Sequence, residues 1–290
     1  PYVYILAGDI SYNRGDLASL HTQITEIRKL YPAAHITCCA LSPENCASWV
    51  DAHVIKRSIF LNRQQIKYLR QADIVVWGGG AQLADHSCRL LVPYWASVLF
   101  FIRYILRKRI VAVSHGVVLR TAIGRMLARQ ACEMLEIIAA RDSRSMQTLK
   151  DLKFTTPLVQ TADYAFLLDP DRQPNEDAQA LMEEGQGNVI AITLTFWHLY
   201  NSTRDTLPYI FRRRLGLYRL RDEHKMQQFK EGLAKLASAI IEKHDGYVRF
   251  ISRYPHPLWD DVRHLEDVKA MCSRPDRVLI YKKESISVTQ

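Results

Sequence analysis

The sequence predicts an α/β fold with parallel sheets, arranged in two domains. The chain has 290 residues, about twice the usual size of one domain. Short apolar runs alternate with helical patterns, which is typical of parallel sheets covered by helices. This alternation stops at residues 170–187, which are rich in Pro, Gly, Gln and acidic residues, and then resumes.

We therefore predict a first domain at residues 1–172, a linker at residues 173–187 and a second domain at residues 188–290. The second domain holds only three expected strands, and we expect it to be truncated. The chain begins at Pro1 without an initiator Met or a signal peptide, so we also expect a trimmed N-terminus.

Apolar periodicity places the elements of the first domain. Residues 2–7 are a predicted buried strand, and a helix is predicted from about residue 16 to residue 30, capped by Asp16, because apolar residues recur there at steps of three and four. Further strands are predicted at residues 35–41, 72–80, 109–116 and 136–142 and within residues 157–168. Further helices are predicted at residues 63–70, 90–106, 122–130 and 143–152.

The second domain continues the same alternation. Strands are predicted at residues 188–195, 246–253 and 277–281, and a helix at residues 259–271. Another helix is predicted to bury one apolar face, formed by Phe229, Leu233, Leu236 and Ile240.

Composition narrows the class of protein. The chain is 48% apolar and 24% charged, which excludes a disordered chain, and no collagen or heptad repeat is present. The net charge of +9 favours an acidic partner, which is a phosphorylated or carboxylated substrate, a nucleic acid or an anionic membrane. No C-x-x-C motif occurs among the six cysteines, so we expect reduced, buried thiols in a cytoplasmic protein.

Residues 90–106 are apolar and are followed by the basic run Arg107 to Arg109. The uninterrupted apolar part, before Arg103, has only about 13 residues, short of the ~20 that span a bilayer. We interpret the segment as a buried helix. The alternative is a helix in the interface of an anionic membrane, which makes peripheral contact with the inner membrane face a second expectation for localisation.

Candidate site residues follow the predicted strands, where ligands bind in open α/β sheets. After the first strand comes a loop with Asp9, Asn13, Arg14, Gly15 and Asp16, which either contacts an anion or a sugar hydroxyl at a helix N-terminus or is a plain capped turn. The run Gly78, Gly79 and Gly80 either admits a ligand or makes a sharp strand-to-helix bend. Gln82 and Asp85 are expected to line the same cleft.

Two further strand ends carry candidate catalytic groups. His115 is either a general acid or base or a hydrogen-bonded structural histidine. Arg141 can clamp a carboxylate or a phosphate bidentately, or form an ion pair with Asp142 or Asp163. In the second domain, Arg253 and His256 follow a strand, and the spacing of His256 to the acidic residues beyond it does not predict a metal site.

Spacing alone thus indicates a two-domain α/β protein that binds an anionic ligand. The order of six segments adds a resemblance: GDISYNRGDLASL, ADIVVWGGGAQLAD, VAVSHGV, AARDSRSMQTLKDL, TADYAFLL and SRYPHPLWDD. In this order they resemble the polysaccharide pyruvyl transferase family over about residues 2–265. The resemblance implies two Rossmann-like domains in a glycosyltransferase-B-like arrangement.

The resemblance also implies an activity. It is the transfer of the enolpyruvyl group of phosphoenolpyruvate to a sugar of a cell-surface polysaccharide (an exopolysaccharide) or its lipid-linked precursor, as a pyruvate ketal. Phosphoenolpyruvate is then the donor substrate, no cofactor is needed and no nucleic acid is expected as a partner. Its two anionic groups need cationic partners, for which Arg141 and the helix N-terminus at Asp16 are the candidates. Asp163, Arg253 and His256 complete the expected substrate contacts.

Two departures from the family pattern qualify this function. The R-L-H signature expected in the second domain, which is thought to hold the phosphate and the catalytic histidine, has no counterpart before Gln290. Truncation or an inactive relative explains this, and if the acid belongs to that signature, the chain binds phosphoenolpyruvate but turns over poorly. The loop SYNRGD also replaces a shorter Gly- and Asn-rich turn, which alters the expected acceptor contacts.

Three alternative functions stay open. They are a nucleotide-sugar glycosyltransferase, a non-catalytic relative, and an RNA-binding protein that uses the basic and aromatic residues 209–225.

Overall fold

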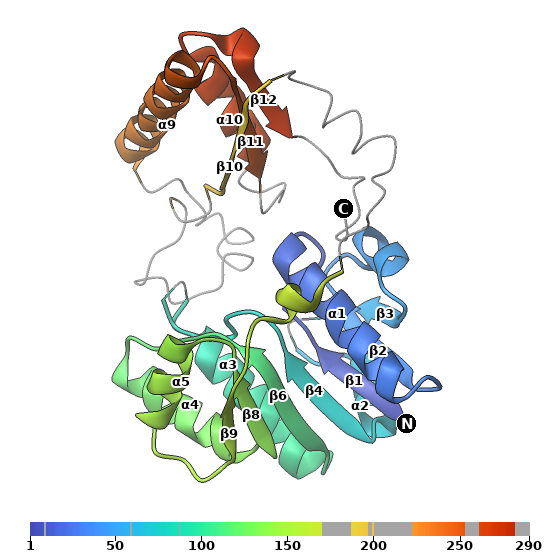
Figure 1. Ribbon diagram of the computed structural model, residues 1–290. Coiled ribbons are helices and arrows are strands. Elements are labelled where there is room, and N and C mark those ends of the chain that lie inside the picture. Colours follow the sequence, from blue (N-terminus) through green and yellow to red (C-terminus); the bar gives the residue numbers. More distant parts are fainter. Residues whose placement is uncertain are drawn as a thin grey trace. The chain divides into compact units, whose positions relative to one another are not determined.

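The computed structural model describes residues 1–8, 10–58, 60–86, 88–169, 187–196, 199, 222–252 and 261–281. The chain divides into two compact units (Figure 1). The first contains Pro1–Leu168, and the second contains the described residues from Asp169 onward.

The first unit is built on a parallel sheet of seven strands in the order β3-β2-β1-β4-β6-β8-β9. Its strands are β1 (Tyr2–Leu6), β2 (His35–Ala40), β3 (His53–Lys56), β4 (Ile74–Gly78), β6 (Arg109–His115), β8 (Ile137–Ala140) and β9 (Leu158–Gln160). The chain runs outward from β1 to β3 and then returns to β4, so the topological switch point lies between β1 and β4.

Helices and short turns connect these strands. They are α1 (Arg14–Leu30), η1 (Pro43–Asn45), η2 (Ala47–Trp49), α2 (Arg63–Gln71), α3 (Leu91–Phe100), η3 (Phe101–Ile105), α4 (Ala122–Glu133), α5 (Ser143–Lys150) and η4 (Tyr164–Leu167). Side chains of α2, α3, α4 and α5 share one core with β4, β6 and β8. The segment predicted as one helix at residues 90–106 is α3 followed by the π-helical turn η3.

The triple glycine makes a bend that differs from the predicted one. Gly79 and Gly80 have φ values of 79° and 77°, which glycine adopts without strain. A strand follows the bend rather than a helix, because β5 (Leu83–Ala84) pairs in parallel with β7 (Val117–Val118). Two-residue strands carry no periodic signal, so the sequence did not predict them.

The second unit contains a parallel sheet in the order β10-β11-β12, formed by Val189–Leu194, Tyr247–Ser252 and Val278–Tyr281. The other elements among its described residues are α9 (Glu223–His244), α10 (Asp261–Ala270) and η5 (Pro275–Arg277). The predicted apolar face of α9 was wrong at Leu236, which is 49% exposed. The small residues Ala234 and Ala237 are buried instead, because they let the helix lie close to its neighbours.

No disulfide joins any of the six cysteines and all six are buried, as predicted. Burial raises the pKa of Cys38 and of Cys132, so each stays a thiol at neutral pH. We expect the folded protein to react with a thiol reagent such as DTNB more than about a hundredfold more slowly than the unfolded chain. Rapid reaction of one thiol in the native state would contradict the buried placement.

Candidate functional site

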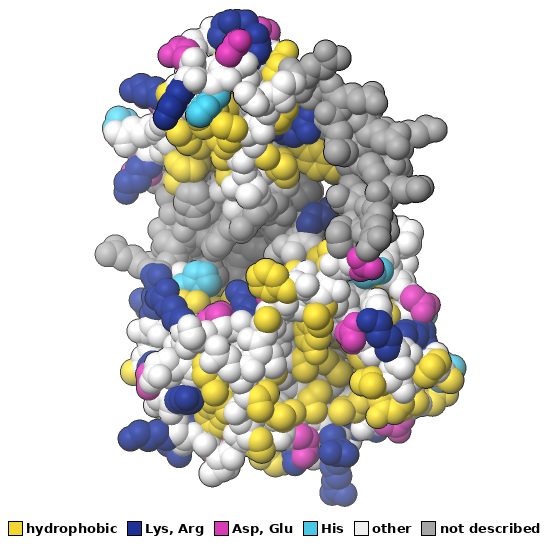
Figure 2. Space-filling model, in the orientation of Figure 1, with side chains coloured by type: hydrophobic (Ala, Val, Ile, Leu, Met, Phe, Trp, Pro, Cys, Tyr) yellow, Lys and Arg dark blue, Asp and Glu magenta, His cyan; other side chains and the backbone are white. Residues whose placement is uncertain are grey.

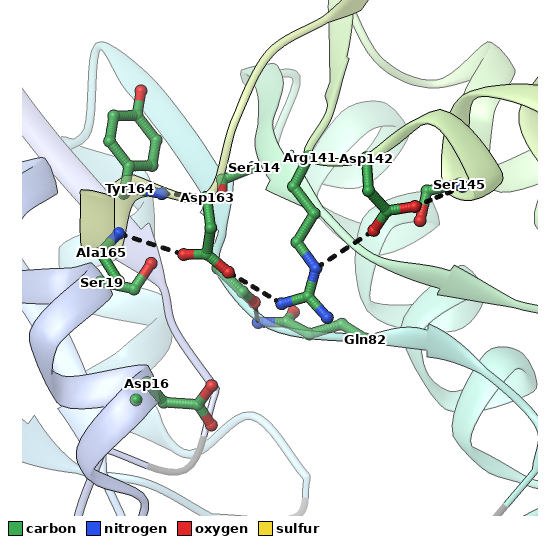
Figure 3. Close-up of polar contacts among 12 residues, drawn as sticks. Asp16, Ser19, Gln82, Ser114, Arg141, Asp142, Ser145, Asp163, Tyr164 and Ala165 are labelled. Carbon is green, nitrogen blue, oxygen red and sulfur yellow. Dashed lines mark hydrogen bonds and ion pairs between the residues drawn. The ribbon is translucent and has the colours of Figure 1, made fainter. Parts of the chain in front are cut away.

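The carboxyl ends of β1, β4, β6 and β8 bring most of the predicted site residues of the first unit to one edge of the sheet. This edge includes the switch point between β1 and β4, where open α/β sheets bind their ligands. Figure 3 shows Asp16 and Ser19 of α1 at this edge, with Gln82, Arg141, Asp142 and Asp163.

Helix α1 lies directly against the triple glycine through a stripe of polar residues. A Cβ atom on Gly80 would lie 2.8 Å from Asp16 Oδ1, one on Gly79 would lie 3.1 Å from Ser19 Oγ, and one on Gly78 would lie 2.5 Å from Gln23 Oε1. Three consecutive glycines therefore meet three successive polar positions of α1. The run of glycines is explained by this close packing without any ligand.

The N-terminus of α1 differs from the prediction. Asn13, not Asp16, caps the helix, because the Asn13 Oδ1 atom accepts hydrogen bonds from the backbone N–H groups of Gly15 (3.0 Å) and Asp16 (3.4 Å). Asp16 lies in the first turn instead. The guanidinium of Arg14 lies 4.9 Å from the ring centroid of Trp49.

Arg141 is the cation at the centre of this edge. Its Nη1 donates to Asp163 Oδ2 at 3.0 Å, and its Nε lies 3.6 Å from Asp142 Oδ2 (Figure 3). The ion pairs considered as the alternative to ligand binding are thus both formed. Asp142 also caps α5 by accepting from the Ser145 backbone N–H at 2.7 Å. Burial alone raises the pKa of Asp142, but the hydrogen bonds from Ser145 and the charge of Arg141 outweigh it and lower the pKa.

The guanidinium of Arg141 lies against Gly116. A Cβ atom on Gly116 would lie 2.7 Å from both Nε and Nη2 of Arg141, so glycine is needed for this approach. The Gly116 N–H donates to the Gly80 carbonyl at 3.1 Å, which puts Arg141 on the same edge as the triple glycine. Within the described ranges, Nη2 has no hydrogen-bond acceptor, and the side chain is 31% exposed. Nη2 therefore keeps hydrogen-bonding capacity that the described residues do not use.

Backbone strain occurs at the same edge. Ser114 has a φ of 53°, which is uncommon for a residue with a side chain. It lies where the pairing of β6 with β8 becomes irregular, and its buried Oγ accepts from the Tyr164 N–H at 3.2 Å. This bond ties η4, and with it Asp163, to the end of β6.

His115 is a structural residue in this arrangement, which does not favour its predicted catalytic role. The side chain is completely buried, its Nε2 lies 3.0 Å from the Trp77 carbonyl oxygen, and the two rings are 4.2 Å apart. Burial lowers the pKa of His115 to about 4, against a smaller rise from the Trp77 carbonyl. Because a carbonyl only accepts, Nε2 carries the proton, and the neutral ring has none to give from Nδ1.

The low pKa of His115 makes stability depend on pH. The folded state keeps this ring neutral, so its contribution is complete above pH 6.5, the ordinary histidine pKa, and is lost as the pH falls towards 4. We expect the His115 ring to lower the free energy of unfolding by about 2 kcal/mol between pH 7 and pH 4.5. Urea unfolding at both pH values should show it in the wild type and not in His115→Gln. Equal losses in the two proteins would contradict the buried neutral ring.

Gln82 and Asp85 have internal roles rather than facing an open cleft. The Gln82 side chain accepts from the Trp77 indole N–H and donates to the Gly79 carbonyl at 3.0 Å. Asp85 is 1% exposed and accepts from the N–H groups of Arg120 (2.7 Å) and Thr121 (2.8 Å). Gln82 thus stabilises the glycine bend, and Asp85 joins the end of β5 to the turn before α4.

Sequence reasoning missed three residues of this edge. Ser19 and Gln23 were detectable, since they follow Asp16 at steps of three and four. Arg57 was not, because the short strand β3 before it was itself missed. The Arg57 Nη1 donates to the Gly8 carbonyl at 3.1 Å, and its guanidinium lies 5.4 Å from the Trp95 ring centroid.

Some predicted residues cannot be placed. Asp9, Arg253, His256 and most of the basic segment at residues 209–225 lie outside the described residues. Of the acidic pair after His256, Asp261 is buried and accepts from the Phe196 N–H at 3.0 Å and from Ser252 Oγ at 3.0 Å. Among the described residues no cluster of three or more His, Cys, Asp or Glu side chains forms a metal site, and no helix could span a membrane.

Solved structures share this fold. S. aureus MnaA, in its co-structure with UDP, has a TM-score of 0.57 at 12% identity over 99% of this chain and 70% of its own. A glycosyltransferase from Rickettsia africae has a TM-score of 0.53 at 14% identity over 99% and 69%. A UDP-N-acetylglucosamine 2-epimerase from Rickettsia bellii has a TM-score of 0.51 at 10% identity over 100% and 70%. The chain therefore has the α/β fold with two Rossmann-like units found in glycosyltransferase-B proteins and related epimerases.

The family is defined by sequence. A family model, polysaccharide pyruvyl transferase, matches residues 13–279, and no curated protein sequence matches the chain. The match covers most of the chain, so this protein belongs to the polysaccharide pyruvyl transferase family, a family of transferases.

Proposed function

We propose that this protein transfers the pyruvyl group of phosphoenolpyruvate to two hydroxyls of a sugar, in a cell-surface polysaccharide or its precursor. Family membership supports the proposal. The observation that carries it is the placement of Arg141 against Gly116, at the carboxyl ends of the strands where the switch point also lies, with no hydrogen bond from Nη2 among the described residues. No cofactor is part of the proposal.

The donor substrate accounts for the need for a guanidinium. Phosphoenolpyruvate carries a carboxylate and a phosphate, and either group can take two parallel hydrogen bonds from arginine. The Oδ2 atom of Asp142 lies 3.6 Å from the Nε atom of Arg141, which is longer than a hydrogen bond. The same carboxylate caps α5. An incoming anion therefore competes mainly with Asp163.

The reaction needs three proton transfers besides binding, one to the vinyl carbon and one from each sugar hydroxyl. Protonation of the vinyl carbon makes the adjacent carbon electrophilic, one sugar hydroxyl adds to it, and the second hydroxyl replaces the departing phosphate. The protons of the two hydroxyls leave to a base, for which we propose Asp16, the carboxylate of α1 beside Gly8 and Gly80. We assign the acid to no described residue, since His115 is neutral and buried.

Calorimetric titration tests this function with two ligands. We expect phosphoenolpyruvate to bind to the chain and UDP to bind at least about tenfold more weakly. Tight binding of UDP without binding of phosphoenolpyruvate would instead indicate a nucleotide-sugar enzyme.

A further inference from the structure

An exposed apolar tip ends the α3 and η3 segment. Phe100, Tyr104 and Ile105 are 50%, 54% and 61% exposed, whereas the neighbouring Leu99 and Ile102 are completely buried and anchor the segment. The rings of Phe100 and Tyr104 lie 5.0 Å apart. We call Phe100, Tyr104 and Ile105 the η3 tip.

Basic residues follow the η3 tip in the chain and lie at the neighbouring end of α2. The chain turns back into β6 at Arg107, which has a φ of 56°, and both Arg107 and Arg109 are exposed. The Lys108 Nζ donates to the Arg70 carbonyl at 2.6 Å, which joins the end of α2 to this turn. The end of helix α2 adds the exposed side chain of Arg70.

These cations are not neutralised by the described part of the chain. No ion pair within it involves the basic residues of α2 or those of the turn after η3. Arg103 does not belong to this basic group, because its Nη1 pairs with Glu136 Oε1 at 2.7 Å. Basic and hydrophobic side chains share the end of the first unit at which its strands begin, low in the view of Figure 2.

We propose that the η3 tip and the basic residues beside it, Arg70 and Arg107 to Arg109, dock the protein on an anionic membrane surface. Apolar and aromatic side chains beside Lys and Arg match the acyl boundary and the anionic headgroups of a bilayer. An acidic protein surface would pair with the Lys and Arg side chains. It would not account for the exposure of the three apolar side chains of the η3 tip. Half of the residues of α3 are buried, so docking is confined to the tip rather than to the whole apolar segment.

The docking surface is separate from the candidate active site. The η3 tip precedes β6, at the edge where the strands begin, whereas Arg141 follows β8 at the carboxyl edge. Substitutions at the tip therefore leave the proposed substrate contacts in place. Binding to membranes and binding of phosphoenolpyruvate can fail independently.

Vesicle co-sedimentation of the full chain tests the proposal. We expect binding to phosphatidylcholine vesicles with roughly 30% phosphatidylglycerol, and at least about tenfold weaker binding to pure phosphatidylcholine. The double variants Tyr104→Ser/Ile105→Ser and Arg107→Gln/Arg109→Gln should each lower the binding roughly tenfold. Binding should also weaken when salt is raised from about 0.1 M to about 0.5 M.

A matched control is available on α9. Lys235→Gln/Lys243→Gln and Leu236→Ser remove exposed residues of the same kinds in the second unit, and we expect them to bind vesicles like the wild type. If this surface instead binds an acidic protein, the chain should not bind anionic vesicles. Absence of binding to these vesicles therefore overturns the proposal. Equal losses in the α9 variants overturn it too. Circular dichroism of each variant verifies that it is folded.

Discussion

Arg141→Ala is expected to raise the dissociation constant of phosphoenolpyruvate roughly tenfold to a hundredfold. The substitution removes the guanidinium that lies against Gly116, and it leaves the carboxylates of Asp142 and Asp163 facing the anion. Both the lost attraction and the added repulsion weaken binding. Calorimetric titration of wild type and variant measures the change.

Two further variants show whether this effect is specific. Arg141→Lys keeps the charge but loses the planar fork, so we expect binding between that of the wild type and that of Arg141→Ala. Arg144→Ala removes an exposed arginine of the neighbouring helix α5 and should leave binding unchanged. The ion pairs of Arg141 are about one-third exposed, so its removal should cost little stability. Wild-type affinity in Arg141→Ala would exclude this residue from the site.

Trp77→Ala is expected to lower the free energy of unfolding by about 3–5 kcal/mol. Trp77 is completely buried, lies 5.6 Å from the Trp95 ring and 4.2 Å from the His115 ring, and donates its indole N–H to Gln82. Its loss leaves a cavity under the triple glycine and an unpaired amide. Chemical denaturation measures the difference.

Control substitutions separate packing from hydrogen bonding. Trp77→Phe keeps much of the volume but leaves the Gln82 oxygen without its donor, so we expect a loss of about 1–3 kcal/mol. Trp49→Ala removes a half-buried indole that lies against Arg14, and about 1 kcal/mol should be lost. If Trp77→Ala is no more damaging than Trp49→Ala, the core described beneath the site is wrong.

Apolar periodicity predicted the strands and helices that carry large buried side chains. The long elements, such as α1 and β6, were therefore identified within a few residues. The strand β3 was missed because only one of its four residues is buried. The cap of α1 was misplaced because Asn13 and Asp16 are both good capping residues, and only the backbone geometry distinguishes them.

The sequence predicted where the candidate site lies better than it predicted what each residue of the site does. Strand ends placed Gly80 and Arg141 at one edge, since parallel strands end on the same side of a sheet. The sequence did not predict that the glycines pack against the polar stripe of α1 or that Asp85 is buried, and it left the role of His115 open. These contacts join segments far apart in the chain, and periodicity carries no information about such pairs.

Amide hydrogen exchange with and without phosphoenolpyruvate tests the central claim most directly. The account predicts slower exchange at residues 78–82, 114–118 and 141–145, which contain the glycine bend, Gly116 and Arg141. This protection should disappear in Arg141→Ala at the same concentration of phosphoenolpyruvate. Saturating binding without protection in any of these segments would place the substrate elsewhere and contradict the account.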